Sequence, residues 1–308
     1  VANYGGPTRF YEMSNKKIID KASELGLDKI TGGRSVVSGH ILSNNIDIFA
    51  ANERGSNFLY KNIDGIFFDM AASQRVLDTY QNGRGTVLSD ILYRGNLDII
   101  NGNWDGYHRL FVKRENFFED IATSPFNTPS KIRTVISADF DNDGFDEVFM
   151  NNIGEPNKLF KILDNGKVKE ISIKTALEPN GLGTGAAVAD IDNDGILELL
   201  ISHGEVGLQK LTLYKANIVK KKNFIRIKPL NKNGAPARGA TVTLISNKRK
   251  HAKTIDSGSG YLCQMEPVAH YGIRDKEEDF LVKIRWTNGE ESTYKINEVG
   301  KTYTYTQK

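Results

Sequence analysis

The sequence predicts an all-β protein in which a small β-propeller of four or five blades is followed by a domain resembling a β-sandwich. Three observations support this fold class. Related segments recur about every 50 residues, short β-branched runs alternate with turn residues, and long helical patterns are nearly absent. Short strands at such a period are typical of propeller blades. An open β-solenoid is the alternative.

The repeat is clearest in two acidic segments that begin at Asp139 and Asp190, 51 residues apart. Both have the form D-x-D-x-D-G-x-x-E. Two worn copies keep the closing acid, at Asp98 and Asp47, and each of the four copies follows a run of small or β-branched residues. Residues 9–20 match only the outer hairpin of a blade, and an N-terminal segment can complete the last blade of a closed ring. We therefore expect four or five blades.

The periodicity stops near residue 216, where the run Lys220–Lys222 marks a linker. We therefore divide the chain into a propeller over residues 1–216 and a second β domain over residues 217–308. Runs such as 224–227, 241–245 and 280–286 predict strands in the second domain, and Asn288-Gly289 is a hairpin turn signal. The expected architecture is an antiparallel sandwich.

Charge is distributed unevenly between the two predicted domains. The whole chain carries +3, but residues 217–308 hold 18 basic and 9 acidic residues, a net +9, and residues 1–216 carry −6. The overall balance argues against a dedicated nucleic-acid-binding protein. Either the oppositely charged domains dock on each other or the basic one meets an anionic partner. The basic run 247–251 is a solvated hairpin tip, or it contacts anionic glycans, lipid headgroups or the acidic propeller.

The sequence gives no sign of a transmembrane segment, a cysteine-based bond or metal site, or a catalytic motif. No run approaches the roughly 18 apolar residues of a membrane helix, so no transmembrane segment is expected. Cys263 is the single cysteine, which excludes an internal disulfide and a CxxC metal site. None of the five histidines lies in an HExxH motif and there is no GxSxG sequence, so we assign no catalytic residue.

The two complete acidic segments predict two calcium sites. Ca²⁺ prefers six to eight oxygen ligands, and acids at alternate positions of a tight turn can direct their carboxylates to one centre. The glycine permits the sharp turn, a backbone carbonyl adds one oxygen, and the closing Glu completes the shell. Without His or Cys in the turns, Zn²⁺ is disfavoured. The expected ligands are Asp139, Asp141, Asp143, the Phe145 carbonyl and Glu147, and then Asp190, Asp192, Asp194, the Ile196 carbonyl and Glu198.

The worn copies are not expected to bind Ca²⁺. The second has Leu92 and Arg94 at ligand positions, and an ion pair of Arg94 with Asp90 and Asp98 could replace the metal. A separate aromatic-rich turn holds Trp104, Tyr107 and His108, which could stack on a sugar ring or simply pack between blades. These three residues are possible ligand-binding residues.

The acidic segments resemble the FG-GAP or VCBS repeat of integrin-type propellers. Residues 239–242, 257–262, 270–273 and 284–289 are similar to the ASPIC/UnbV domain, with Tyr271 in place of its usual Phe and Thr287 in place of its usual Pro. The combination resembles the CRTAC family, although this propeller is shorter than is usual there. The resemblance implies an exported protein, extracellular or periplasmic, that is stabilised by Ca²⁺.

We expect the protein to act in recognition or adhesion, with propeller loops engaging a protein or polysaccharide partner and Ca²⁺ holding those loops in shape. Two alternatives stay open. One is an enzyme of secondary-metabolite or carbohydrate metabolism that uses a pocket on the propeller face. The other is a structural component of a matrix or cell surface.

Overall fold

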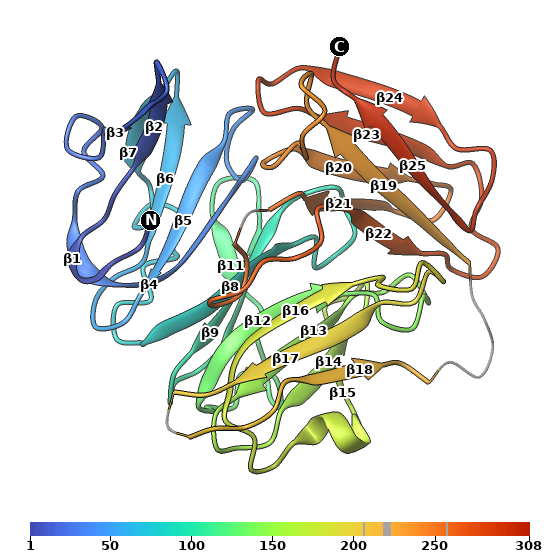
Figure 1. Ribbon diagram of the computed structural model, residues 1–308, viewed down its shortest axis with the longest axis horizontal. Helices are drawn as coiled ribbons and strands as arrows, with labels where there is room; N and C mark the ends of the chain where they lie inside the picture. The colour runs from blue at the N-terminus through green and yellow to red at the C-terminus, as the bar shows by residue number, and fades with distance from the viewer. Residues whose placement is uncertain (206, 218–222, 257) are drawn as a thin grey trace.

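The computed structural model describes residues 1–205, 207–217, 223–256 and 258–308 (Figure 1). Within these ranges the chain forms strands β1 to β25 and a single 3-10 turn, η1 (Lys174–Leu177). The predicted all-β class is confirmed. The linker expected at Lys220–Lys222 lies outside the described residues, so the domain boundary stays a prediction.

The first sheet has five strands in the order β1-β4-β5-β6-β7. They are β1 (Tyr4–Pro7), β4 (Ile30–Gly39), β5 (Asp47–Asn52), β6 (Phe58–Ile63) and β7 (Ile66–Asp69). The N-terminal hairpin of β2 (Tyr11–Ser14) and β3 (Lys17–Asp20) pairs only with itself within the described sheets. β1 pairs with β4 of the first sheet, so the N-terminal segment does not complete the last blade.

Three further sheets repeat the same up-and-down order. The second contains β8 (Gly83–Ser89), β9 (Asp98–Asn103), β10 (Arg109–Lys113) and β11 (Phe118–Asp120). The third contains β12 (Ile132–Ala138), β13 (Glu147–Asn152), β14 (Lys158–Ile162) and β15 (Val168–Ile171). The fourth contains β16 (Gly183–Ala189), β17 (Glu198–His203) and β18 (Thr212–Lys215).

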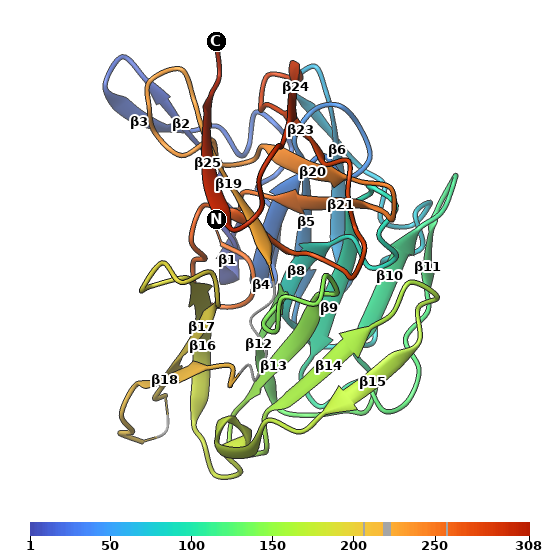
Figure 2. The same cartoon turned by 90° about the vertical axis from the view of Figure 1, so that its right-hand side faces the viewer.

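The four sheets stand side by side as blades, with strands β4, β8, β12 and β16 toward a common axis (Figures 1 and 2). β4 contacts β8, β8 contacts β12, and β12 contacts β16, whereas no comparable contact joins β16 to β4 among the described residues. The array is therefore open. Apolar side chains fill each junction, as Phe49 and Ile99 do between the first two sheets and Ile136 and Leu199 between the last two.

The C-terminal strands form two sheets around their own core. The first is ordered β22-β19-β25 and the second β21-β20-β23-β24. Their bounds are β19 (Phe224–Leu230), β20 (Thr241–Ile245), β21 (Lys250–Thr254), β22 (Ala269–Gly272), β23 (Leu281–Arg285), β24 (Glu291–Lys295) and β25 (Lys301–Thr306). Trp286 and Tyr271 are fully buried between the sheets. The hairpin at Asn288-Gly289 joins β23 to β24 as predicted, but β19 and β25 run parallel, so the sandwich is not purely antiparallel.

The connection between β21 and β22 runs along the inner strands of the blades. The Gly260 amide donates to the Thr86 carbonyl at 2.6 Å, and the Gly260 carbonyl accepts from the Thr86 amide and the Ser35 hydroxyl. The Thr134 hydroxyl donates to the Tyr261 carbonyl at 2.9 Å. Gly260 has φ +77, and a Cβ there would lie 2.8 Å from the Thr134 side chain, so glycine is needed at this close approach. One segment thus ties the C-terminal sheets to three blades.

Candidate metal sites

The third blade carries the first complete acidic turn, which joins β12 to β13. Asp139 accepts from the Gly144 amide through Oδ2 at 2.8 Å, and Glu147 accepts from the Phe140 amide through Oε2 at 3.0 Å. Gly144 has φ +83, which an L side chain rarely adopts. The two outermost acids of the motif are therefore fixed by backbone amides, and this brings single carboxylate oxygens of Asp139, Asp141 and Glu147 within 4.8 Å of one another.

A lysine lies among these carboxylates. Lys161 Nζ is 3.1 Å from Asp141, 2.5 Å from Asp143 and 2.9 Å from Glu147. The position follows from strand register, because Lys161 on β14 pairs directly with Glu147 on β13. Burial lowers the pKa of Lys161, but Glu147 and Asp143 raise it by more. The ammonium therefore stays charged.

The fourth blade repeats this arrangement at the turn between β16 and β17. The Gly195 amide donates to Asp190 at 3.1 Å, and the Ile191 amide donates to Glu198 at 2.8 Å. Lys215 Nζ lies 2.7 Å from Asp192, 3.0 Å from Asp194 and 2.6 Å from Glu198. Oxygens of the three aspartates, Asp190, Asp192 and Asp194, lie within 4.8 Å of one another. The two turns therefore share one design.

The turns differ in their exposure to solvent. The Lys161 side chain is 12% exposed, whereas the Lys215 side chain is 31% exposed. Burial, with Asp146 and Asp143 nearby, raises the pKa of Asp139 to about 7. Asp192 has its pKa lowered, chiefly by its hydrogen bond to Lys215. Burial also raises the pKa of Asp190, the equivalent of Asp139, so the clear difference between the turns is the greater exposure of the fourth.

The donor set fits a hard divalent cation. Both turns offer carboxylate oxygens from several acids at close range, and neither contains a His or Cys ligand, which favours Ca²⁺ over Zn²⁺. A metal would take the place of the lysine ammonium in each turn. The roles predicted for the Phe145 and Ile196 carbonyls stay predictions.

The two lysines are the residues that sequence reasoning missed. We expected clustered acids to need a metal because they repel one another, but the chain supplies its own cation in each turn. The signal was present in the sequence, since Lys161 lies 14 residues and Lys215 lies 17 residues beyond the closing acid of its turn, in the strand that follows. Identifying it required the register of that strand against its neighbour.

The first two blades satisfy their acids with backbone amides. Asp47 accepts from the amides of Leu42, Ser43 and Asn62. In the second blade, Asp90 accepts from the amides of Arg94, Gly95 and Ala252, and Asp98 accepts from those of Ile91 and Lys113.

The ion pair expected of Arg94 with Asp90 and Asp98 is wrong. The Arg94 guanidinium donates instead to the Lys113 carbonyl at 3.1 Å, and within the described ranges it forms no salt bridge. The acids need no side-chain cation because amide donors already surround them. The arginine is therefore left to face solvent.

The first acid of three turns also binds the C-terminal sheets. Asp90 accepts from the Ala252 amide, Asp139 accepts from the Gly272 amide, and Asp190 pairs with Arg226, each at 2.8 to 3.0 Å. In the first blade, which lacks that acid, the neighbouring His40 bonds Thr241 at 2.8 Å. The C-terminal sheets therefore rest on one turn from every blade.

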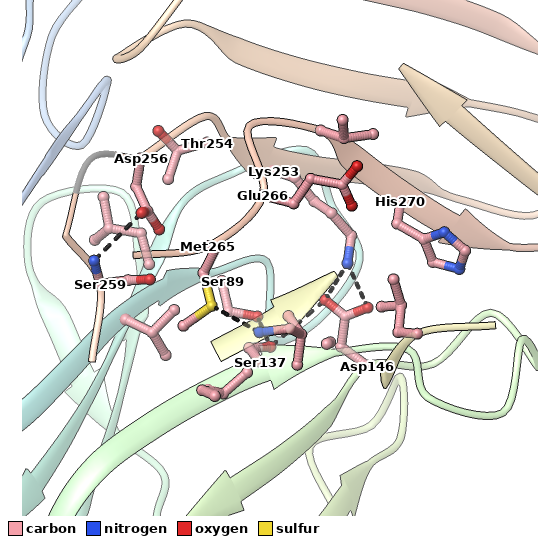
Figure 3. A pocket seen from close by; sticks show the side chains of 17 residues that line it. Ser89, Ser137, Asp146, Lys253, Thr254, Asp256, Ser259, Met265, Glu266 and His270 are labelled. Carbon is pink, nitrogen blue, oxygen red and sulfur yellow. Dashed lines mark hydrogen bonds and ion pairs between the residues drawn. The ribbon is translucent and has the colours of Figure 1, made fainter. Parts of the chain in front are cut away.

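The third blade adds a buried ion pair to this junction. Asp146 lies 2.7 Å from Lys253, as Figure 3 shows. It also lies 3.2 Å from His251. Burial raises the pKa of the Asp146 carboxyl, but Lys253 and His251 outweigh burial and hold this pKa well below its usual range. Burial lowers the pKa of His251 to about 3, so the imidazole is neutral and acts as a hydrogen-bond partner.

The basic run 247–251 is partly packed against the acidic propeller and partly exposed to solvent, two of the environments considered for it. Arg249 and His251 are buried against the propeller, where Arg249 donates to the Gly144 carbonyl and pairs with Glu277. Lys248 and Lys250 are exposed. The run is therefore the turn between β20 and β21 together with the start of β21, and it docks on the acidic blades with only part of it solvated.

The three aromatic-turn candidates do not converge on one site. Trp104 packs under the guanidinium of Arg133, 4.2 Å from the ring centroid, and Tyr107 is exposed. His108 is fully buried, accepting from the Asn103 amide and bonding Ser130 at 3.0 Å. The structure thus gives His108 a packing role in the turn.

Comparisons with known proteins agree with this architecture. A family model described as ASPIC and UnbV matches residues 230–308, and one described as FG-GAP-like repeat matches residues 139–201, which include both acidic turns. The chain combines FG-GAP-like repeats with an ASPIC and UnbV domain. Among the described residues, no helix is long and apolar enough to cross a membrane.

Curated relatives extend the match over most of the chain. Cartilage acidic protein 1 of Xenopus tropicalis is 46% identical over 90% of this chain and 45% of its own length. The Homo sapiens protein of that name is 44% identical over 94% of this chain and 48% of its own length. The chain thus spans about half the length of these relatives. The resemblance to the CRTAC family is confirmed.

Solved structures resemble the chain only distantly. AofleA from Arthrobotrys oligospora aligns with a TM-score of 0.32 at 8% identity, covering 87% of this chain and 88% of that one. A mutant of AofleA with three arginines replaced by alanine aligns over the same shares with a TM-score of 0.39 at 9% identity. Similarity at this level carries no functional argument.

Proposed function

We propose that this is an exported calcium-binding protein that acts in recognition or adhesion, with Ca²⁺ in a structural role. The observation that carries the proposal is the pair of equivalent turns in the third and fourth blades, each gathering carboxylate oxygens around one cation position. The relatives are named for cartilage and for acidic character, which supports an extracellular setting.

Calcium would bind by displacing a lysine ammonium. In each turn the ammonium contacts three carboxylates, which is a partial substitute for the six to eight oxygens that Ca²⁺ gathers. Lys215 can swing into solvent from its exposed position, and Lys161 has less room to do so. We therefore expect the fourth turn to load more readily than the third.

Bound Ca²⁺ would stabilise the junction between blades and C-terminal sheets. Asp139 and Asp190 each contact the C-terminal sheets while belonging to a metal turn, so a metal that fixes these turns also fixes the surface on which those sheets rest. A ligand at 100 times its Kd adds about 2.7 kcal/mol to the folded state at each site. A protein or polysaccharide partner would then be engaged by loops of the stabilised blades.

Chelation tests this proposal. We expect EDTA to lower the melting temperature and excess Ca²⁺ to restore it, and we expect Asp141→Ala with Asp192→Ala to remove the difference. The matched control is Glu115→Ala with Glu170→Ala, which removes two exposed acids elsewhere and should keep the full response. A melting temperature that does not respond to EDTA or Ca²⁺ would refute the proposal.

A further inference from the structure

A cavity lies between the first two blades and the C-terminal sheets, away from the two metal turns. It has a volume of about 510 Å³, within the range of small-molecule sites. Its walls come from the turns after β4 and β8 and from strands β20, β21 and β23. In Figure 1 these strands lie beside the upper end of the first sheet. We call this cavity the junction pocket.

The junction pocket is lined by five cationic side chains and, among the described residues, by no acidic one. The cations are Arg94, Lys113, Lys250, Lys283 and Arg285. The nearest acids of the first two blades, Asp47, Asp90 and Asp98, are buried and accept from backbone amides instead. Segments distant in sequence thus bring positive charge to one cavity.

These cations have few partners. The Lys113 ammonium donates to the Ile41 carbonyl at 2.6 Å, and the Arg94 guanidinium donates to the carbonyl of Lys113. Lys250 forms no salt bridge within the described part of the chain. Lys283 and Arg285 share a single carboxylate, that of Glu291, at 2.7 and 2.9 Å. Five positive charges therefore face the cavity with one paired acid beside them.

Backbone and side-chain hydrogen bonds hold the walls in place. The Lys250 amide donates to the Tyr93 carbonyl at 3.2 Å, which sets Arg94 and Lys250 side by side. His40 bonds Thr241 at 2.8 Å on the opposite wall. The charged side chains are therefore mounted on fixed segments, which reduces the entropy lost when a ligand binds.

The remaining lining indicates what kind of anion fits. Hydroxyl and amide side chains come from Ser43, Asn44, Asn96, Thr241 and Thr243, and no Phe, Tyr or Trp of the described chain lines the cavity. Such groups hydrogen-bond sugar hydroxyls, whereas bases of single-stranded nucleic acid bind by stacking on aromatic rings. Arg and Lys bind sulfate and phosphate oxygens by charge-assisted hydrogen bonds. We propose that the junction pocket binds a saccharide carrying sulfate or phosphate groups.

This inference names a partner class for the recognition role and in that respect rests on the proposed function. The pocket shares no residue with the metal turns. Either proposal can therefore fail alone, and binding measured both in Ca²⁺ and in EDTA separates them.

Calorimetric titration tests the pocket. A heparin-derived tetrasaccharide, its desulfated form and myo-inositol hexakisphosphate serve as probes. We expect the wild-type protein to bind at least one anionic probe and to ignore the desulfated form. Arg94→Gln with Lys250→Gln, two exposed cations without salt bridges in the described chain, should weaken binding about tenfold or more. Preference for the tetrasaccharide or for the inositol phosphate identifies sulfate or phosphate as the natural group.

The control is Lys228→Gln with Lys248→Gln, which lowers net charge equally with exposed lysines outside the pocket and should leave the affinity within about twofold. Arg94→Lys with Lys250→Arg should keep binding. If the pocket double variant fails to fold, Lys250→Gln alone replaces it. Absence of binding by every probe, or equal weakening in the control, would overturn the proposal.

Discussion

The acidic turns of the first two blades and those of the last two share a hydrogen-bonded frame but neutralise their carboxylates differently. In every blade the closing acid accepts an amide from the start of its own turn, as Asp47, Asp98, Glu147 and Glu198 do. In the first two blades, backbone amides satisfy most of the remaining carboxylate oxygens. In the last two, Lys161 and Lys215 provide the counter-charge.

This difference shows that a closing acid alone does not define a metal site. The frame needs that acid for its own closure. This explains why both worn copies keep the closing acid although they have lost the acids at the third and fifth positions. The acids at alternate positions, such as Asp141 and Asp192, have no part in that closure and gather around a cation instead. They are therefore the residues that distinguish a metal turn from a structural one.

The third turn should show the largest mutational effect. It alone has an acid, Asp146, where the other turns have Ile46, Leu97 and Leu197. Asp146→Ala leaves Lys253 without its buried partner, and we expect unfolding in urea to show a loss of about 3–5 kcal/mol. Asp164→Ala removes an exposed partner of Arg274 and should cost under about 1 kcal/mol. Similar losses in both variants would contradict the role of the buried pair.

The second turn should show the next largest effect, as a dependence of stability on pH. Burial raises the pKa of Asp98 to about 7. Between about pH 4 and 7 the folded chain therefore holds a proton that the unfolded chain has lost, so stability falls as pH rises, by about 1.4 kcal/mol per unit. Asp98→Asn should remove this slope. Relative to wild type it should gain about 2 kcal/mol in urea unfolding from pH 5 to pH 7, because the slope flattens near the folded pKa. An unchanged slope would rule out the assignment.

Replacing the lysines of the third and fourth turns should have the smallest effect, and it should appear in Ca²⁺ affinity. With no ammonium to displace, Lys161→Met and Lys215→Met should each bind Ca²⁺ about tenfold more tightly at the altered turn, an effect of about 1.4 kcal/mol. Lys61→Met, at the matching position of the first blade, is the control and should leave Ca²⁺ affinity unchanged. Weaker Ca²⁺ binding in either of the first two variants would indicate that the lysine assists the metal.

The sequence predicted the repeat, the blade-like sheets and the hairpin at Asn288-Gly289, because these depend on local periodicity and turn chemistry. It did not predict the lysines in the turns, since Lys161 meets Glu147 only through pairing of neighbouring strands. Nor did it predict the position of Arg94. The expected partner of Arg94, Asp90, already accepts from backbone amides, and one of these belongs to Ala252, 162 residues away. Contacts between distant segments decided every feature that was missed.

The opposite charges of the two regions were visible in the sequence, and the structure shows how they meet. Docking was one of two alternatives, and Arg226, Arg249 and Lys253 indeed contact the acidic blades. The same domain leaves Lys250 and Arg285 at the junction pocket. Docking of the oppositely charged regions is therefore observed, and the anionic partner stays a proposal.

The stoichiometry of Ca²⁺ binding tests the central claim most directly. Calorimetric titration of the chelator-treated chain should show two Ca²⁺ per molecule, one of which is lost in Asp141→Ala and the other in Asp192→Ala. Binding of no Ca²⁺ would mean that the lysines replace the metal permanently. Two ions that persist in both variants would place the sites elsewhere, and either result would contradict the distinction between the two pairs of turns.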